Sequence, residues 1–475
     1  MSARDYRMLI GSEMISASEV LDVVNPADGA PFAACPRASL ADLDRAVAVA
    51  KGAYPAWKAV PIDTRRAKLR QAAGIIARHA DELAGLFTRE QGRPTRFATE
   101  EILGAAYWFQ ATADLDLPVD VIEDTDLRRI EVHHVPLGVV CAIVPWNFPV
   151  LLFSFKVAPA LLTGNTVVLK PSPFTPLCTL RIGELLKDVF PPGVLNIISG
   201  GDELGPQMTA HPGFSKITFT GSTSTGKRVM ESAARDLKRI TLELGGNDAA
   251  IVMPDVDVDS VSERLFEGAF SNTAQICVAT KRLYVHEDIY DAVRDKLHGL
   301  AKAAIVGDGA EQGSRFGPIQ NKAQYERVKD LLRDAEETGL QILRGGPVPT
   351  AGYFVPLTIV DNPPDTARVV REEAFGPILP MMKFRELSDV IRRVNDSEYG
   401  LAGAVWSRDI ELAQKIAAEM ETGTVWINQN LQSTPYTPLT GHKHSGFGSE
   451  NGVYGLREFT LPKAVYIPKD VPAAG

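Results

Sequence analysis

A cysteine with a carboxylate and an amide upstream carries the chemistry that this sequence suggests. Cys277 lies in FSNTAQICVATK (residues 270–281), Glu243 in TLELGGND and Asn147 in VPWNFP. An isolated cysteine is more often a small buried apolar residue than a nucleophile. A thiol, a base and an amide that can donate to an oxyanion are, however, the groups that covalent acyl chemistry on a carbonyl needs. We therefore expect these three side chains to meet in one site.

The composition excludes several classes of protein. The chain has 475 residues, 45% of them apolar and 23% charged, with a net charge of −9. This length and composition are typical of a globular protein of two or three domains. A negative charge without a basic cluster argues against a nucleic-acid partner. The four cysteines are widely spaced and indicate neither a disulfide framework nor a zinc site. No apolar segment is long enough for a signal peptide or a membrane span. We expect a cytoplasmic protein that needs no metal.

The order of elements predicts an α/β fold. Helix-compatible segments separate short β-branched runs, an alternation that implies a mostly parallel sheet with its ligand crevice at the carboxyl ends of the strands. VPWNFP, KPSPFTP, GSTSTG and ELGG all follow such runs directly. The expected strands of this sheet are residues 138–144, 166–169, 194–198, 216–220 and 239–243.

Other segments have their own patterns. Residues 40–57 and 62–90 show apolar positions at helical spacing, and a second α/β block from about residue 248 includes a predicted helix over 260–274. Residues 119–138 read as a hairpin-like insertion. The last run, AVYIP, resembles an edge strand, and such a strand is usually covered by another subunit. We therefore expect a homo-oligomer, either a dimer or a tetramer.

A glycine-rich turn supplies a possible anion site. Gly221 to Gly226 follows a predicted strand and opens a predicted helix, so backbone N–H groups could bind a phosphate there. With Lys227 the segment nearly matches a P-loop, and a P-loop ATPase is the first alternative function. Position 228, however, is Arg where Mg²⁺ requires a Ser or Thr hydroxyl. The turn does not match GxGxxG either.

Taken together and in this order, five motifs resemble those of the NAD(P)-dependent aldehyde dehydrogenase superfamily over nearly the whole chain: VPWNFP, KPSPFTP, FTGSTSTGK, LELGG with QIC, and EEAFGPIL. The resemblance implies a fold of three parts. A Rossmann-like cofactor domain would comprise residues 1–117 and 139–244, and an α/β catalytic domain residues 245–456. A small β oligomerisation element would comprise residues 118–138 and 457–475.

The resemblance also implies catalytic roles. Cys277 looks like the nucleophile that forms a thiohemiacetal and then a thioester, and Asn147 like the amide that holds the oxyanion. Glu243 resembles the base that activates the hydrolytic water, and Lys156 the lysine that supports proton movement. Because coenzyme-A-acylating relatives do not need that base, Glu243 favours release of a free acid.

The same comparison assigns residues to cofactor and substrate. Trp146, Lys170, Gly221, Ser222, Gly226, Glu373 and Phe375 match the cofactor site. Pro173 stands where many NAD-preferring members carry a Glu that repels a 2′-phosphate, so NAD is expected and NADP remains open. Thr440 replaces a common glycine and is expected to narrow the tunnel mouth. The implied tunnel is apolar and favours an apolar or aromatic aldehyde; it is lined by Phe148, Leu151, Phe155, Ile276, Val278 and Leu439.

The sequence thus predicts oxidation of an aldehyde to a carboxylic acid with NAD(P)⁺. A P-loop-type ATPase remains the alternative from another class. A catalytically silent family member with a binding role is a third hypothesis, although nucleophile, base and amide are all present.

Overall fold

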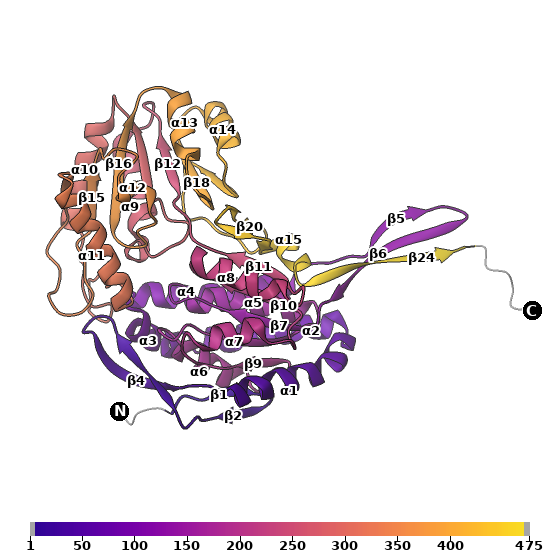
Figure 1. The fold of residues 1–475 in the computed structure, drawn as a ribbon. Helices are drawn as coiled ribbons and strands as arrows, with labels where there is room; N and C mark the ends of the chain where they lie inside the picture. The colour runs from indigo at the N-terminus through magenta and orange to yellow at the C-terminus, as the bar shows by residue number, and fades with distance from the viewer. Residues whose placement is uncertain (1–4, 470–475) are drawn as a thin grey trace, which may run out of the picture.

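The computed structural model describes residues 5–469 and contains two large sheets, one in each half of the molecule (Figure 1). The family fold expected from the sequence is confirmed in its general form, since both sheets are mainly parallel and are flanked by helices. Among the described residues, no helix combines the length and the apolar character needed to cross a membrane.

The first sheet has the strand order β2-β1-β9-β8-β7-β10-β11-β22. The chain runs outward from β7 to β8 and β9, then returns to the other side of β7 for β10 and β11, and these five strands are parallel. The order therefore reverses between β7 and β10, where ligands bind in sheets of this kind. The five predicted strands are confirmed. The bounds are β1 (Met8–Ile10), β2 (Glu13–Ile15), β7 (Val139–Ile143), β8 (Thr166–Lys170), β9 (Leu195–Ile197), β10 (Lys216–Thr220), β11 (Arg239–Glu243) and β22 (Gly446–Phe447).

Most helices of this half are amphipathic, and their apolar faces share one core with the sheet. The helix over Pro149–Leu162 is instead buried on nearly every side. The predicted helical run over 62–90 is two helices, because His79 (φ −106°, ψ 16°) leaves helical geometry and its Nδ1 lies 2.9 Å from Ile75 O. The helices are α1 (Leu40–Ala59), α2 (Ile62–Arg78), α3 (Ala80–Gln91), α4 (Thr95–Ala113), α5 (Pro149–Leu162), α6 (Leu177–Leu186), α7 (Leu204–Ala210) and α8 (Thr223–Ala234).

The second sheet, in the order β14-β15-β16-β13-β12-β18-β19, is parallel except between β14 and β15. Side chains alternate along β12: Ile251 joins one core cluster, and Ala250 and Val252 join the other. Its strands are β12 (Ala249–Val252), β13 (Arg282–His286), β14 (Gln341–Arg344), β15 (Thr358–Asp361), β16 (Ile378–Phe384), β18 (Ala402–Trp406) and β19 (Thr424–Ile427). Its helices are α9 (Val258–Phe270), α10 (Tyr290–Ala303), α11 (Lys322–Glu337), α12 (Arg368–Arg371), α13 (Leu387–Asn395) and α14 (Ile410–Glu419).

A three-stranded sheet extends away from the body (Figure 1). The predicted hairpin forms β5 (Asp120–Asp124) and β6 (Arg128–Pro136), and β24 (Thr460–Pro468) pairs with β6 along its whole length. Residues 470–475 of the predicted oligomerisation element lie outside the described residues. The remaining short elements are β3 (Val20–Asn25), β4 (Ala30–Pro36), β17 (Tyr399–Gly400), β20 (Leu439–Thr440), β21 (His442–Lys443), β23 (Ser449–Glu450), α15 (Gly452–Arg457) and a 3₁₀ turn over Ser271–Ala274.

Candidate active site

A polar cavity of about 390 Å³ opens at the reversal point of the first sheet. Trp146 follows β7, Gly221 and Ser222 follow β10, and all three line the cavity. The second half of the chain closes it with Glu373 and Phe375. The two ring centroids of Trp146 and Phe375 lie 5.4 Å apart in an edge-on contact. Five of the seven residues expected at a cofactor are therefore side by side.

Helix α8 points its N-terminus into this cavity. Ser222 caps the helix by accepting a hydrogen bond from Thr225 N at 3.3 Å, and the remaining N–H groups of the first turn can bind an anion. Gly226 lies one turn in, and a Cβ there would be 2.4 Å from Leu244 Cδ2. The glycine therefore allows α8 to approach the end of β11. This cradle fits the pyrophosphate of a dinucleotide.

Lys170 does not line this cavity among the described residues. It ends β8 and is 4% exposed, with its Nζ donating to Pro171 O at 3.2 Å. Burial lowers the pKa of Lys170 to about 8, although Asp202 and Glu203 counteract that shift. Pro173, in the turn after β8, is partly exposed.

The turn that carries Glu373 and Phe375 is held by hydrogen bonds from two other segments. Phe375 adopts φ 47°, an uncommon backbone conformation for a bulky residue. Gln324 supports this turn, because its Nε2 donates to Ala374 O at 2.7 Å and to Phe375 O at 3.1 Å. The Glu373 carboxylate accepts from Gly246 N at 3.1 Å. Gln324 was not singled out in the sequence.

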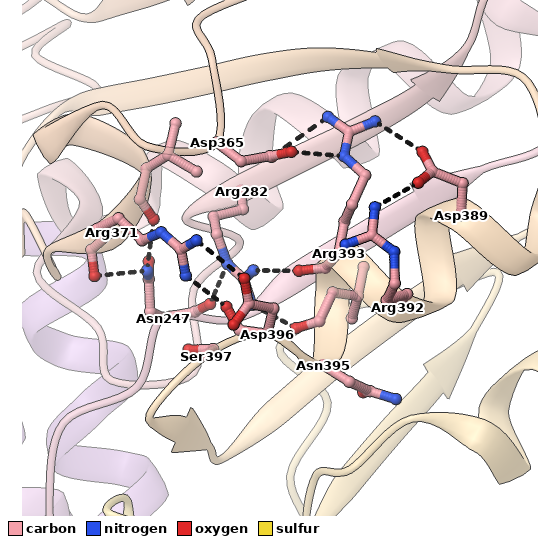
Figure 2. Close-up of polar contacts among 12 residues, drawn as sticks. Asn247, Arg282, Asp365, Arg371, Asp389, Arg392, Arg393, Asn395, Asp396 and Ser397 are labelled. Carbon is pink, nitrogen blue, oxygen red and sulfur yellow. Dashed lines mark hydrogen bonds and ion pairs between the residues drawn. The ribbon is translucent and has the colours of Figure 1, made fainter.

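A polar network fixes the segment that follows the ELGG motif (Figure 2). Arg282 Nε donates to Asn247 O at 2.7 Å, and Asn247 Nδ2 donates to Val370 O at 2.8 Å. Since Val370 lies shortly before Glu373, these bonds join the segment that carries Glu373 to the segment whose Gly246 N–H binds its carboxylate.

A second, smaller cavity of about 180 Å³ contains all six residues expected in the substrate tunnel: Phe148, Leu151, Phe155, Ile276, Val278 and Leu439. Trp426 and Leu431 extend its apolar wall. The wall also includes polar side chains, namely Thr424, Gln432, Ser433 and Thr437. Thr440 is not among the described residues that line this cavity. Its hydroxyl instead lies 2.7 Å from Ser449 Oγ. The structure thus gives no support for a tunnel narrowed by Thr440.

Cys277 and Asn147 line both cavities. Cys277 is partly exposed, whereas Cys35, Cys141 and Cys178 are buried. Burial raises the pKa of the Cys277 thiol to about 12; Lys281 lowers it, and Glu243, Asp248 and Glu373 raise it further. The thiol is therefore neutral at rest, at the point where the two cavities meet.

A left-handed turn directs the chain toward Cys277. The predicted helix over 260–274 ends at Phe270, because Asn272, Thr273 and Ala274 have φ of 51°, 55° and 60°. Asn272 tolerates this conformation better than most residues. Its Oδ1 accepts from Arg93 Nε at 3.0 Å, and Thr273 Oγ1 donates to Gly317 O at 2.9 Å. Side-chain contacts therefore compensate for the unfavourable backbone.

Asn147 is 4% exposed and comes from the β7–α5 connection. Its Nδ2 donates one hydrogen bond to Gln275 O at 3.0 Å, and its carbonyl accepts from Arg93 Nη2 at 2.6 Å. Arg93 also pairs with the buried carboxylate of Glu101. One N–H of the Asn147 amide is left for a substrate oxygen.

Glu243 ends β11 and is 3% exposed, and within residues 5–469 neither of its carboxylate oxygens has a hydrogen-bond partner. Burial raises the pKa of Glu243 well above its usual value, the nearby Glu450 raises it further, and Lys156 lowers it. A carboxyl group with a raised pKa is a stronger base once it is ionised, which suits Glu243 to general base catalysis.

Lys156 is fully buried and forms an ion pair with Glu450, while its Nζ donates to Thr218 Oγ1 at 3.2 Å. Glu450 was not among the residues expected from the sequence. It lies 294 positions after Lys156, in a segment with no periodic or motif signal. The pair brings a second carboxylate and an ammonium group to the electrostatic surroundings of Glu243.

Comparisons with known proteins agree with this geometry. The model of the aldehyde dehydrogenase family matches residues 14–465. Phenylacetaldehyde dehydrogenase of Pseudomonas fluorescens is 37% identical over 484 aligned residues, which cover 97% of this chain and 96% of the relative. Succinate-semialdehyde dehydrogenase [NADP(+)] of Escherichia coli is 36% identical, covering 95% of each chain. The NAD⁺ complex of betaine aldehyde dehydrogenase from Staphylococcus aureus superposes with a TM-score of 0.94 at 32% identity and covers 98% of both chains.

Proposed function

The chain belongs to the aldehyde dehydrogenase family, and from this premise we propose that it oxidises an apolar or aromatic aldehyde to the free carboxylic acid through a thiohemiacetal and a thioester of Cys277. One observation carries the proposal. A polar cavity at a helix N-terminus and an apolar cavity meet at the side chains of Cys277 and Asn147. An aldehyde in the second cavity would then lie between the thiol and a dinucleotide in the first.

In the first step the Cys277 thiol would pass its proton to the Glu243 carboxylate, and the sulfur bonds to the aldehyde carbon. The carbonyl oxygen gains the negative charge, which the free N–H of Asn147 and the Cys277 backbone N–H would stabilise. A single donor of this kind typically lowers a barrier by about 3 kcal/mol. The bond from Asn147 Nδ2 to Gln275 O keeps the amide oriented before substrate arrives.

NAD(P)⁺, when bound, accepts the hydride that leaves the thiohemiacetal carbon. We propose that the N-terminus of α8 with Ser222 holds the pyrophosphate, that Trp146 and Phe375 contact the cofactor, and that Glu373 bonds the nicotinamide ribose. Lys170 would reach the adenosine ribose from the end of β8. Pro173 supplies no charge against a 2′-phosphate, so NAD is our assignment and NADP the alternative.

Glu243 would remove a proton from the water that attacks the thioester, and the Cys277 thiol would be released with the acid. The Lys156–Glu450 pair can take up or return that proton, because it lies in the same buried group of charges. A base at this position favours hydrolysis over transfer of the acyl group to coenzyme A.

The tunnel wall supports the choice of substrate. No basic side chain lies among the described residues that line the apolar cavity, so the wall provides no partner for a substrate carboxylate. Phenylacetaldehyde dehydrogenase, a relative named for an aromatic aldehyde, is 37% identical to this chain over nearly the full length of both. An apolar or aromatic aldehyde therefore fits better than a semialdehyde acid.

Two further expectations remain proposals. The sheet of β5, β6 and β24 exposes Ile122 and Tyr466, and the turn between β5 and β6 exposes Leu127. These apolar side chains favour pairing with another subunit in a homodimer or homotetramer. The P-loop ATPase is less well supported, because Lys227 is exposed and is not among the described residues that line the polar cavity.

The test is reduction of NAD⁺ and NADP⁺ by the purified protein with aliphatic, aromatic and carboxylated aldehydes. We expect turnover with the apolar and aromatic compounds, and no turnover in Cys277→Ala. Substantial activity of that variant would contradict the proposed nucleophile. If the unmutated protein reduces neither cofactor with any aldehyde, the result would instead favour the hypothesis of a catalytically silent family member.

A further inference from the structure

A buried lysine lies directly against the backbone of the nucleophile. Lys281 is 5% exposed and follows Cys277 by four positions. Its Nζ donates to Cys277 O at 2.5 Å and lies 3.4 Å from Glu373 Oε1. Its backbone N–H donates to Asp248 O at 2.9 Å, next to the start of β13. The ammonium group is therefore fixed beside the backbone of Cys277 by contacts at both ends of the residue.

The charges around Cys277 make the position of the Lys281 ammonium group important for ionisation of the thiol. Three carboxyl groups, those of Glu243, Asp248 and Glu373, oppose ionisation of the thiol, and so does burial. Asp248 is itself buried, and burial raises its pKa to about 7. Lys281 is the group whose positive charge acts in the opposite direction on the Cys277 thiol. Without it, a thiolate would form in a field dominated by carboxylates.

The geometry points to Lys281 as a positioning residue: by holding its ammonium group between Cys277 O and the Glu373 carboxylate, it stabilises the thiolate form of the Cys277 nucleophile. The inference rests on the proposed function in one respect, that Cys277 is the nucleophile. It adds an electrostatic source for the reactivity of the thiol. The same contact holds the Glu373 carboxylate at the edge of the cofactor cavity.

A purely structural role predicts a different behaviour. A lysine that only satisfied Cys277 O could be replaced without loss by a neutral side chain that still donates a hydrogen bond. An electrostatic role requires a loss in every neutral variant, including one that keeps a donor, and recovery in a variant that keeps the positive charge. A comparison of such variants therefore separates the two roles.

The experiment measures the rate of Cys277 alkylation by iodoacetamide between pH 6 and 10.5, on the full-length protein without aldehyde or cofactor, with Cys277→Ala as the blank. Lys281→Gln removes the charge but keeps a donor for Cys277 O, Lys281→Met removes both, and Lys281→Arg keeps the charge. Lys238→Met is the matched control. Lys238 is also a buried lysine bonded to a carbonyl, Thr209 O at 2.9 Å, but it is not among the charges that shift Cys277.

We expect loss of the charge to raise the pKa of the Cys277 thiol further, which slows alkylation about tenfold or more in both neutral variants. The loss should be similar across the measured range, because the thiol stays below its pKa throughout. Lys281→Arg and Lys238→Met should keep the original rates. If Lys281→Met does not fold, Lys281→Gln still decides the question.

An unchanged rate in Lys281→Gln, or the same loss of rate in Lys281→Arg, would overturn the inference. Because alkylation requires neither cofactor nor turnover, such a result leaves the proposed dehydrogenase activity to be judged by Cys277→Ala. Conversely, an inactive protein can still show the predicted loss of rate.

Discussion

Replacement of Arg93 by Met should displace the Asn147 amide, the proposed oxyanion donor, from its position relative to Cys277. The guanidinium group is 5% exposed and donates to Asn147 O at 2.6 Å, to Asn272 Oδ1 at 3.0 Å and to Glu101. Asn147 belongs to the connection after β7, and Asn272 to the left-handed turn before Cys277. One side chain thus fixes both parts of the site, which come from opposite halves of the chain.

The structure gives the expected magnitudes. Met fills a similar length but cannot donate, so Glu101 keeps its burial and loses its counter-ion. Breaking such a pair costs about 3–5 kcal/mol of the free energy of unfolding. Glu101 still accepts from Val150 N at 3.0 Å and Leu151 N at 3.1 Å, so we expect about 3 kcal/mol, the lower end. Because the Asn147 amide is displaced rather than removed, kcat/KM should fall about 10- to 100-fold, less than for deletion of a donor.

A double-mutant cycle tests whether the loss of activity passes through Asn147. We would measure kcat/KM for an apolar aldehyde in Arg93→Met, in Asn147→Ala and in the double variant, with urea denaturation for stability. If Arg93 acts by placing Asn147, the double variant should be little worse than Asn147→Ala alone. Losses that multiply would refute the reasoning. Arg392→Met, which removes an exposed arginine paired with Asp389, is the control and should change neither quantity.

Two more predictions concern the base and the phosphate cradle. Burial and the Glu450 carboxylate raise the pKa of Glu243, so the base is active only above a raised pKa and thioester hydrolysis should increase with pH through that value. Glu450→Gln removes a repelling charge and frees Lys156, so the acid limb of single-turnover acid release should move to lower pH; an unmoved limb would exclude this coupling. Gly226→Ala places a Cβ 2.4 Å from Leu244 Cδ2 and should cost about 1–3 kcal/mol of stability and raise the KM for the cofactor. Gly299→Ala in α10, where nothing lies within 4 Å of the new Cβ, is the control and should be neutral or stabilising by thermal denaturation.

The sequence predicted those features that depend on neighbours in the chain. Short β-branched runs, separated by helix-compatible segments, predicted β7, β8, β10 and β11. Such runs are expected because a parallel strand that is buried on both faces is apolar over consecutive residues. The wall of the apolar cavity could also be predicted from the sequence. Phe148, Leu151 and Phe155 follow Asn147 at helical spacing, and Ile276 and Val278 flank Cys277. The helix over 260–274 was drawn too long, because the signal for its end lies in side-chain contacts of Asn272 and Thr273 with distant segments.

Residues that act by pairing across the fold could not be found in this way. Arg93 is 179 positions from Asn272, and Glu450 is 294 positions from Lys156. A charged residue in a polar stretch of sequence usually lies at the surface. Only the folded chain shows that Arg93, Glu450 and Lys281 are buried, and that each of them is paired with another charged group.

The two reacting groups of the chain restrain one another. Burial raises the pKa of both the Cys277 thiol and the Glu243 carboxyl group, and a negative charge on Glu243 further opposes a thiolate. Cys277 can pass its proton to Glu243 only when that carboxyl group is ionised. The transfer then exchanges one negative charge for another without adding a second, and the raised pKa of Glu243 favours its keeping the proton. A resting neutral thiol is also a poor target for oxidants, since the thiolate is the reactive form. The Cys277 thiol would therefore ionise when Glu243 is free to accept its proton, and the same carboxyl group would later activate water.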